Sequence, residues 1–473
     1  MLTIAYPRPA DFLASVPFDC EIDPKLVLMD EVLDDPKLLL AVTNDLARSA
    51  PRALETGRPA TPAEVTLRVA VARRLMGWGY HTAEAEVAGS AKWRWFCRVY
   101  SESMPDHSTL RDREALIRPA TLRRVNSRLL HLAQDRGVTR GEKLRSDSTV
   151  IETDIHYPTD SRLLNDSVRV IGRTLERARD VLHPPPSAKP LFRNRRRQAR
   201  RLARAIAQRL RGTKGAKQPE KKAERLYRQL VDVVERTVAQ AEAVLVRLQQ
   251  NKNRRAQTLA ASLQHYLPLV RRVIAQTCRR VLEGQSVPAG EKLVSLFEPH
   301  TAIIRRGKTP PRDTEFGRKI WYSEVDGGLV SEYRLLKGNP PDEQQWATSI
   351  RQHGKLFGHP PKVATADRGV YSVANEQLAT DAGVAFVALP QPGHKDEDRQ
   401  AHEAQPWFRA ALRFRAGVEG RISVLRRARQ LDRCRNRGEI GLERWLGWGV
   451  IVNNLVLIAT CLVRRQRRKA SHP

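Results

Sequence analysis

The sequence is poor in cysteine and, relative to its basic residues, poor in acidic residues. Its five cysteines, at positions 20, 97, 278, 434 and 461, form no Cys-x-x-Cys pair. This spacing argues against a disulfide framework and a zinc knuckle, and it suits a reducing cytosol. Asp and Glu number 52 against 83 Lys and Arg, so the formal net charge is +31. Such an excess predicts a polyanionic partner, with nucleic acid ahead of an anionic membrane surface.

Targeting signals, internal repeats and long apolar runs are also scarce. The N-terminus lacks the basic segment of a signal peptide, and Asp11 soon interrupts its apolar residues. No internal repeat is evident. One apolar run, residues 445–463, is just long enough to span a membrane, but Asn453 and Asn454 lie at its centre. We therefore expect a buried helix in a cytoplasmic protein with no membrane partner, and we expect both amides to hydrogen-bond to neighbouring groups.

The 473 residues are enough for two or three domains. Residues 1–60 mix apolar runs with Pro and Asp and predict an N-terminal arm of weak order. Residues 61–140 predict short helices separated by Gly turns. This pattern fits a helix-turn-helix-like DNA-binding domain as well as an ordinary helical packing or dimerisation domain. Residues 141–465 are expected to form one further domain, and residues 466–473 a basic tail.

A long basic helical segment occupies residues 162–290. It holds 30 Lys and Arg against 9 Asp and Glu, a net charge of +21. A charge run of this density favours contact with a phosphate backbone over a solvated face. We expect DNA contacts from its densest part, at Arg195, Arg196, Arg197, Arg200 and Arg201.

The chain after residue 316 changes its periodicity. A strand beginning near Leu144 is followed, beyond the basic segment, by a predicted hairpin, helix, strand, helix, strand and helix. This order is typical of an α/β fold of the RNase H-like kind, with a mixed five-stranded sheet. The basic segment would then be an insertion between the first and second strands. The predicted elements after it are a hairpin at 316–336, a helix from 341, strands at 362–366 and 384–389, and a helix at 372–382.

Three acidic residues lie where this fold could bring them together. Asp147 lies in the first strand, Asp367 ends a short apolar strand at a Gly turn, and Glu419 lies in a stretch with helical periodicity. Such acids can hold two divalent cations about 3.5–4 Å apart, which clamp the attacking and leaving oxygens of a phosphodiester. Without a cation or bound water, their mutual repulsion would be costly.

Other interpretations of these positions stay open. Asp367 could belong to a simple Asp-Arg-Gly turn, and Glu419 could be a surface partner of Arg415, one helical turn earlier. Asp326 is best interpreted as a turn residue. The acids that compete with Asp147 are Glu152, Asp154, Asp160 and Asp166.

The three acidic segments resemble a known family. Residues 146–161 resemble the first catalytic block of bacterial insertion-sequence transposases with a DDE triad, most of all those of ISNCY-type elements. Residues 366–372 resemble the second block and residues 414–427 the third. In the third block Arg415 and Glu419 fit the family pattern, whereas Leu412 and Arg426 replace its usual Tyr and Lys. The N-terminal region also resembles the family's helical DNA-binding domain.

This resemblance implies a function. Asp147, Asp367 and Glu419 would hold two Mg2+ ions, for which Mn2+ can substitute. The chain would bind the element's terminal inverted repeats, cut one strand there and transfer the freed 3′-hydroxyl to target DNA, acting as a homo-oligomer on double-stranded DNA near the bacterial nucleoid. Further phosphate contacts would come from Arg368, Arg415 and Arg426. Two rivals remain: a non-catalytic DNA-binding protein derived from a transposase, and a metal-dependent nuclease without strand transfer.

Overall fold

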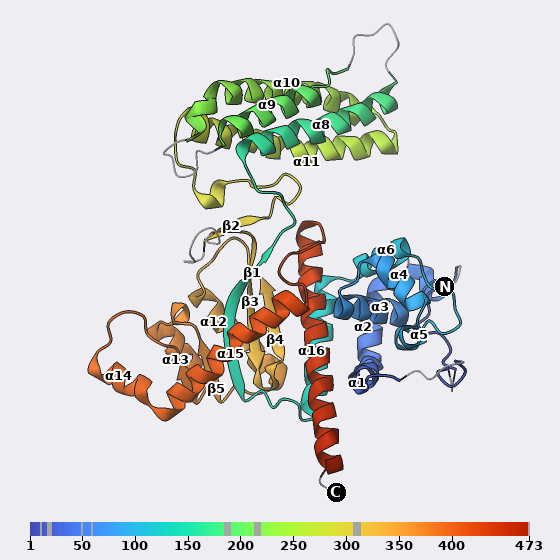
Figure 1. The fold of residues 1–473 in the computed structure, drawn as a ribbon, viewed down its shortest axis with the longest axis vertical. Helices are drawn as coiled ribbons and strands as arrows, with labels where there is room; N and C mark the ends of the chain where they lie inside the picture. Colours follow the sequence, from blue (N-terminus) through green and yellow to red (C-terminus); the bar gives the residue numbers. More distant parts are fainter. Residues whose placement is uncertain are drawn as a thin grey trace. The chain divides into compact units, whose positions relative to one another are not determined.

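The computed structural model describes residues 1–9, 12–16, 21–48, 51–57, 60–183, 191–211, 219–305 and 314–471. The chain forms two compact units, shown in Figure 1. The first consists of Met1–Glu152 and Arg318–Pro473, and the second of Thr153–Gly317. Residues 1–140 lie in the first unit, together with the residues after 318. Residues 162–290 lie in the second unit.

A mixed sheet organises the first unit. Its order is β3-β1-β5-β6, with β4 on β3. The β3–β4 pair is antiparallel, whereas β1 pairs with β5, and β5 with β6, in parallel. The described residues hold six strands, one more than expected, because β2 pairs with the first residues of β3 within the second unit. The strands are β1 (Lys143–Glu152), β2 (Ala302–Arg305), β3 (Thr314–Val325), β4 (Val330–Leu335), β5 (Val363–Ala366) and β6 (Phe386–Ala388).

The predicted hairpin is confirmed as β3 and β4. Its turn contains Gly327 and Gly328, with φ of 82° and 78°, values that favour glycine. A Cβ on Gly327 would lie 2.8 Å from the backbone oxygen of Val138. The Gly-Gly pair therefore allows both the turn and a close approach to the segment that leads into β1.

Helices cover both faces of this sheet. Successive strand residues point to opposite faces, and Leu144 packs in one core cluster with Trp346 of α12 (Glu343–Phe357). Ile151, of opposite parity, packs in another with Val418 of α15 (Pro406–Ala428). In Figure 1, α15 crosses the sheet in front of β1. The predicted helix at 372–382 is confirmed as α13 (Val373–Asp381), and α14 (Glu397–Ala404) precedes α15.

Residues 1–60 contain more helix than expected. Asp23 and Asp35 each accept hydrogen bonds from backbone N–H groups of the following turn, and a proline follows each. Asp-Pro is therefore a helix start here, with the cap followed by Pro at the first position. The two helices, α1 (Pro24–Leu33) and α2 (Pro36–Ala47), bury most of their leucines in the main core. They precede α3 (Ala63–Met76), α4 (Tyr80–Ala88), α5 (Ala91–Cys97), α6 (His107–Leu116) and α7 (Pro119–Asp135).

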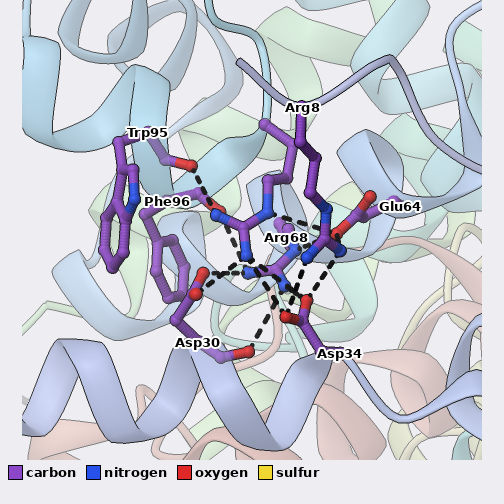
Figure 2. Close-up of polar contacts among 8 residues, drawn as sticks. Arg8, Asp30, Asp34, Glu64, Arg68, Trp95 and Phe96 are labelled. Carbon is purple, nitrogen blue, oxygen red and sulfur yellow. Dashed lines mark hydrogen bonds and ion pairs between the residues drawn. The ribbon is translucent and has the colours of Figure 1, made fainter. Parts of the chain in front are cut away.

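A buried charge network ties these helices together (Figure 2). Arg68 of α3 is fully buried, and its guanidinium bonds Glu64 at 2.9 Å and Asp30 of α1 at 2.6 Å. Arg98, just after α5, lies 2.8 Å from the other Asp30 oxygen. Arg8 of the N-terminal segment bonds Glu64 at 2.9 Å. Because a buried charge left without its partner is costly, this network fixes how α1, α3 and α5 pack.

The apolar run at 445–463 is part of α16 (Gly438–Ser471), which packs against α1, α3, α7 and β4. Among the described residues it is the one helix long and apolar enough to cross a membrane, and 72% of its most apolar window is buried in the protein. The Asn454 amide donates to Asn126 Oδ1 and to the Val330 oxygen, both at 2.8 Å, and Asn453 donates to Asn454 Oδ1 at 3.2 Å. The expected hydrogen bonding of both amides is confirmed. The expected basic tail is helical to Ser471.

The second unit is built on four helices that lie side by side (Figure 1). Their apolar stripes form a separate core, in which Leu230, Val234 and Ala241 are buried. Thr159 and Asn253 cap the first and last of these helices. The four are α8 (Asp160–Leu182), α9 (Arg196–Arg209), α10 (Glu224–Gln250) and α11 (Arg254–Thr277), and they lie between β1 and β2 in the chain.

Candidate active site and basic surfaces

Asp147 of β1 lies beside Asp367, the residue that directly follows the adjacent parallel strand β5. Ser146 of β1 is paired with Ala366 of β5, and each aspartate is the next residue of its chain segment. Neighbouring strands are about 4.8 Å apart, and paired residues of parallel strands point to the same face. Asp147 Oδ1 accepts the backbone N–H of Ser148 at 2.7 Å. The sheet therefore places two carboxylates on the face that α15 covers.

Arg415 of α15 pairs with Asp367 and acts on Asp147 through its charge. Its Nη2 lies 3.1 Å from Asp367 Oδ1. Its charge also lowers the pKa of Asp147, although that contribution is smaller than the effect of burial. The guanidinium thus supplies the positive charge that two neighbouring carboxylates need.

The surroundings of Asp147 raise the pKa of its carboxyl group. Burial raises its pKa to about 6, and the charges of Asp367 and Asp342 raise it further, while Ser148 and Arg415 oppose the shift. Burial therefore disfavours the ionised form of Asp147, and a bound cation would favour it. Carboxylate oxygens are the ligands that Mg2+ prefers, so the donor chemistry of Asp147 and Asp367 fits that ion.

Glu419 is less closely associated with this pair. It is exposed on α15, four residues after Arg415 and hence on the same side of the helix. Within the described ranges its side chain makes no hydrogen bond or ion pair. The carboxylates of Asp147, Asp367 and Glu419 are not all within 4.8 Å of one another. The structure brings the two aspartates together and leaves the glutamate on the neighbouring helix surface.

Several acids that compete with Asp147 have structural partners. Glu152 pairs with Arg433 at 3.0 Å, and Asp160 pairs with Arg280. Asp166 lies 2.8 Å from Arg169 and 3.1 Å from His156. Asp326 accepts from the backbone N–H groups of Arg140 and Lys143 at 2.7 and 3.2 Å, which is a turn role.

Two acids near the site were missed by the sequence analysis. Glu324 of β3 is fully buried and pairs with Arg145 of β1. Asp342, before α12, accepts from Ser148 Oγ at 3.0 Å and lies 2.9 Å from Lys319 Nζ. The signal that could have identified Glu324 is its place in an otherwise apolar strand, since an acid is rarely buried without a partner. Asp342 carried no such signal because it precedes a predicted helix.

Arg145 also sets how closely α15 approaches the sheet. Its guanidinium donates to the Phe414 backbone oxygen and lies 4.6 Å from the centre of the Phe414 ring. A Cβ on Gly417 would lie 2.5 Å from Arg145 Nη1. Gly417 therefore allows the contact that holds the Arg415–Glu419 segment over β1.

The arginines expected to bind DNA differ in whether their side chains are exposed or already paired within the protein. Arg196 pairs with Glu176 at 2.8 Å, and Arg195 donates to Gln240. In contrast, α9 buries Ala199, Leu202 and Ile206 and exposes the opposite, basic face. In the first unit Arg426 pairs with Asp432. The exposed members of the expected set are Arg197, Arg200, Arg201 and Arg368.

A basic cavity of about 1000 Å³ lies within the second unit. Asp160 pairs with one of its arginines, Arg280, and Tyr157, Tyr227 and Phe316 add aromatic surface to its wall. Its basic lining residues are Arg162, Arg200, Arg204, Arg280, Lys292 and Arg305. A concave surface with this lining is suited to a phosphate-bearing ligand.

Comparison with known proteins gives one match. Residues 17–113, from before α1 into α6, match the model of a family described as Transposase domain (DUF772). No curated protein and no solved structure matches the chain. The match supports a transposase, an enzyme class that acts on DNA. It ends before β1, so Asp147, Asp367 and Glu419 lie outside the matched segment.

Proposed function

We propose that this chain is the DNA transposase of an insertion sequence and that it uses a DDE mechanism. The observation that carries the proposal is the position of Asp147 of β1 beside Asp367, which directly follows the adjacent parallel strand β5. It occurs in a chain whose N-terminal segment matches a transposase domain. The strand order β4-β3-β1-β5-β6, with α15 over the face of Asp147, supports an RNase H-like catalytic domain.

In this proposal Asp147, Asp367 and Glu419 hold two Mg2+ ions, with Mn2+ as a substitute. When bound, the ions supply charge stabilisation to the attacking and leaving oxygens of an in-line displacement at phosphorus. The chain's own residues orient the metal-binding side chains and neutralise their charge. Arg415 balances the two aspartates in the metal-free protein. Arg145 holds α15, and with it Glu419, near the sheet.

The second unit is the proposed site of DNA-backbone binding. Arg197, Arg200 and Arg201 are exposed on one helix, and Arg200 also lines the basic cavity. Neutralising several phosphates makes affinity steeply dependent on salt. We propose the element's terminal inverted repeats and target DNA as partners, with oligomerisation on DNA. The place of action would be the bacterial cytoplasm, at the nucleoid.

The decisive experiment measures strand cleavage and strand transfer on DNA carrying the element's ends, with Mg2+. Asp147→Asn, Asp367→Asn and Glu419→Gln should each reduce cleavage at least about a hundredfold, because removing one strong electrostatic contributor costs roughly 10²–10³ in rate. DNA affinity should stay near that of the unmodified chain. Glu397→Gln, at an exposed glutamate of α14, is the matched control and should cleave normally. A variant that retains cleavage would remove its residue from the site.

DNA binding is tested by its salt dependence. Replacing Arg197, Arg200 and Arg201 by Ala should reduce the slope of log affinity against log salt by up to about 3, roughly one for each phosphate that is no longer neutralised. Binding to unrelated sequences should weaken to a similar extent. An unchanged slope would mean that this face of α9 does not contact DNA.

One observation favours a second candidate, a DNA-binding protein without catalysis. Glu419 is exposed and makes no polar contact within the described ranges, so the third carboxylate is not positioned with the other two. A chain that binds its element ends but neither cuts nor joins DNA, with either metal, would support this candidate. Cleavage without joining would instead identify a nuclease.

A further inference from the structure

Three metal-binding side chains meet between α4 and α6, in elements that contribute nothing to the candidate active site. His81 and Glu84 lie three residues apart on α4 and therefore share one face of that helix. His107 is the first residue of α6. One ligand atom from each of the three lies within 4.8 Å of the other two. Within the described residues, no other group of three His, Cys, Asp or Glu side chains meets so closely.

We propose that His81, Glu84 and His107 form a binding site for a single Zn2+ ion. Imidazole nitrogen suits Zn2+ and other first-row transition ions, whereas Mg2+ and Ca2+ favour sites made of oxygen alone. Three protein ligands from histidine and carboxylate, with a fourth position left to water, are an arrangement that Zn2+ adopts in proteins. The proposal does not depend on the DDE mechanism.

The geometry requires the His81 ring to rotate, because two imidazoles that are stacked cannot both point a nitrogen lone pair at one ion. Bonds of about 2.0–2.1 Å in a tetrahedron put ligand atoms roughly 3.4 Å apart. His107 Nδ1 already lies 2.9 Å from Glu84 Oε2. The His81 and His107 rings are stacked, with centroids 3.6 Å apart and an interplanar angle of 27°. Because His81 is exposed, its ring can rotate to complete the site without disturbing a core.

Two of the three ligands are held in place by the backbone. Glu84 Oε2 accepts the backbone N–H of His107 at 2.8 Å, which fixes the carboxylate at the start of α6. The cap residue Asp106 accepts the N–H groups of Ser108 and Thr109 at 2.8 and 3.0 Å. The bonds from His107 lower the pKa of Glu84, so it is an anionic ligand at neutral pH. A site with fixed ligands loses less entropy when the ion binds.

Helix capping alone accounts for only part of this arrangement. Glu84 and His107 suffice to satisfy the first turn of α6. His81 adds nothing to that cap, yet it lies one turn before Glu84 with its ring against that of His107. A bound ion would tie α4 to α6 within the segment that matches the transposase domain.

The test uses the full chain, stripped with a chelator and titrated with ZnCl2 at pH 8 in excess Mg2+. We expect one equivalent to bind, and His81→Ala and Glu84→Gln each to weaken that binding at least tenfold. His265→Ala, at an exposed histidine of α11, and Asp147→Asn should leave it unchanged. Hydrogen exchange in α4 and α6 should slow when Zn2+ is added. Co2+ in place of Zn2+ should give visible absorption without a thiolate charge-transfer band.

Several results would overturn the proposal. These are the absence of a bound equivalent, binding that His81→Ala leaves intact, a thiolate band with Co2+, and weakened binding in Asp147→Asn. Because His81 is exposed, His81→Ala should keep the circular dichroism and melting temperature of the metal-free chain. It therefore remains informative if Glu84→Gln perturbs α6. Failure here would leave the DDE proposal intact, since that site is tested by cleavage.

Discussion

The guanidinium of Arg415 lies 3.1 Å from the carboxylate of Asp367, and the same charge lowers the pKa of Asp147. Asp147 and Asp367 follow the paired residues Ser146 and Ala366 of two parallel strands. A basic side chain from α15 thus neutralises two acids from the sheet. A divalent cation bound by the same carboxylates would compete with Arg415 for them.

Arg415→Gln should therefore strengthen the binding of Mn2+ to the metal-free chain. Removing a unit positive charge close to the site takes away roughly 1 kcal/mol or more of repulsion towards the ion, which is about a fivefold to tenfold gain in affinity. Calorimetric titration with Mn2+ measures this. Arg413→Gln, at an exposed arginine of the same helix, serves as the control. Unchanged or weaker binding in Arg415→Gln would show that Arg415 and the ion do not compete.

Asp147→Asn should stabilise the chain in chelator at pH 8. The pKa of Asp147 is raised from its ordinary 3.8 to about 6, chiefly by burial. The folded state therefore holds a proton that the unfolded state releases. This stabilisation is complete below about pH 4 and is lost as the pH rises through about 6.

A shift of about 2 pKa units corresponds to at most roughly 3 kcal/mol at pH 8. Denaturant unfolding of Asp147→Asn and the unmodified chain at pH 4 and pH 8 measures the effect. We expect the difference at pH 8 only. A variant that is less stable than the unmodified chain at pH 8 would mean that the Asp147 carboxylate makes favourable contacts that outweigh its burial.

His353 should make the fold sensitive to mild acid. Its ring is buried in α12, with Nε2 2.9 Å from the Gly141 oxygen, and burial lowers its pKa to about 4. In the unfolded chain the His353 ring takes up a proton near pH 6.5, whereas in the folded chain it does so only near pH 4. Stability from this group is therefore complete above about pH 6.5 and falls as the pH drops towards 4, by roughly 3 kcal/mol in total.

The measurement for His353 is the slope of unfolding free energy against pH. In His353→Gln the slope between pH 5 and 6 should be smaller by about 1.4 kcal/mol per pH unit, the contribution of one proton. Glutamine can still donate to the Gly141 oxygen. An equal slope in the two proteins would assign the acid sensitivity to other groups.

Periodicity and turn chemistry were enough to predict much of the sheet domain. The hairpin at 316–336, the strand before Asp367 and the helix after it all have strong local signals, and each is observed. The bonding of Asn453 and Asn454 could be predicted because an amide in an apolar helix needs a partner. Local signals of this kind do not depend on which distant segments meet.

Tertiary pairings could not be predicted in the same way. The contact of Arg415 with Asp367, the buried pair of Arg145 with Glu324, and the network around Arg68 each join residues far apart in the sequence. Nothing local distinguishes these arginines from the many that are exposed. Position on a helix face could not determine whether Glu419 reaches the aspartates either, because that depends on how α15 lies over the sheet.

Gly447→Ala should destabilise the fold although alanine favours helices. A Cβ on Gly447 of α16 would lie 2.9 Å from Leu122 Cδ1 and 2.9 Å from the Tyr333 hydroxyl. Both neighbours are buried, so relieving the clash requires α16 to move from α7 and β4. Overpacking of this kind costs typically 1–3 kcal/mol, more than the roughly 1 kcal/mol that alanine gains over glycine in a helix.

Gly354→Ala is the matched control, because its Cβ would meet nothing within 4 Å on α12. Denaturant unfolding should show Gly354→Ala to be more stable than the unmodified chain by up to about 1 kcal/mol, and Gly447→Ala to be less stable. If both substitutions stabilise the chain, α16 does not pack closely against Leu122 and Tyr333 in solution. The description of the apolar run as a buried core helix would then have to be abandoned.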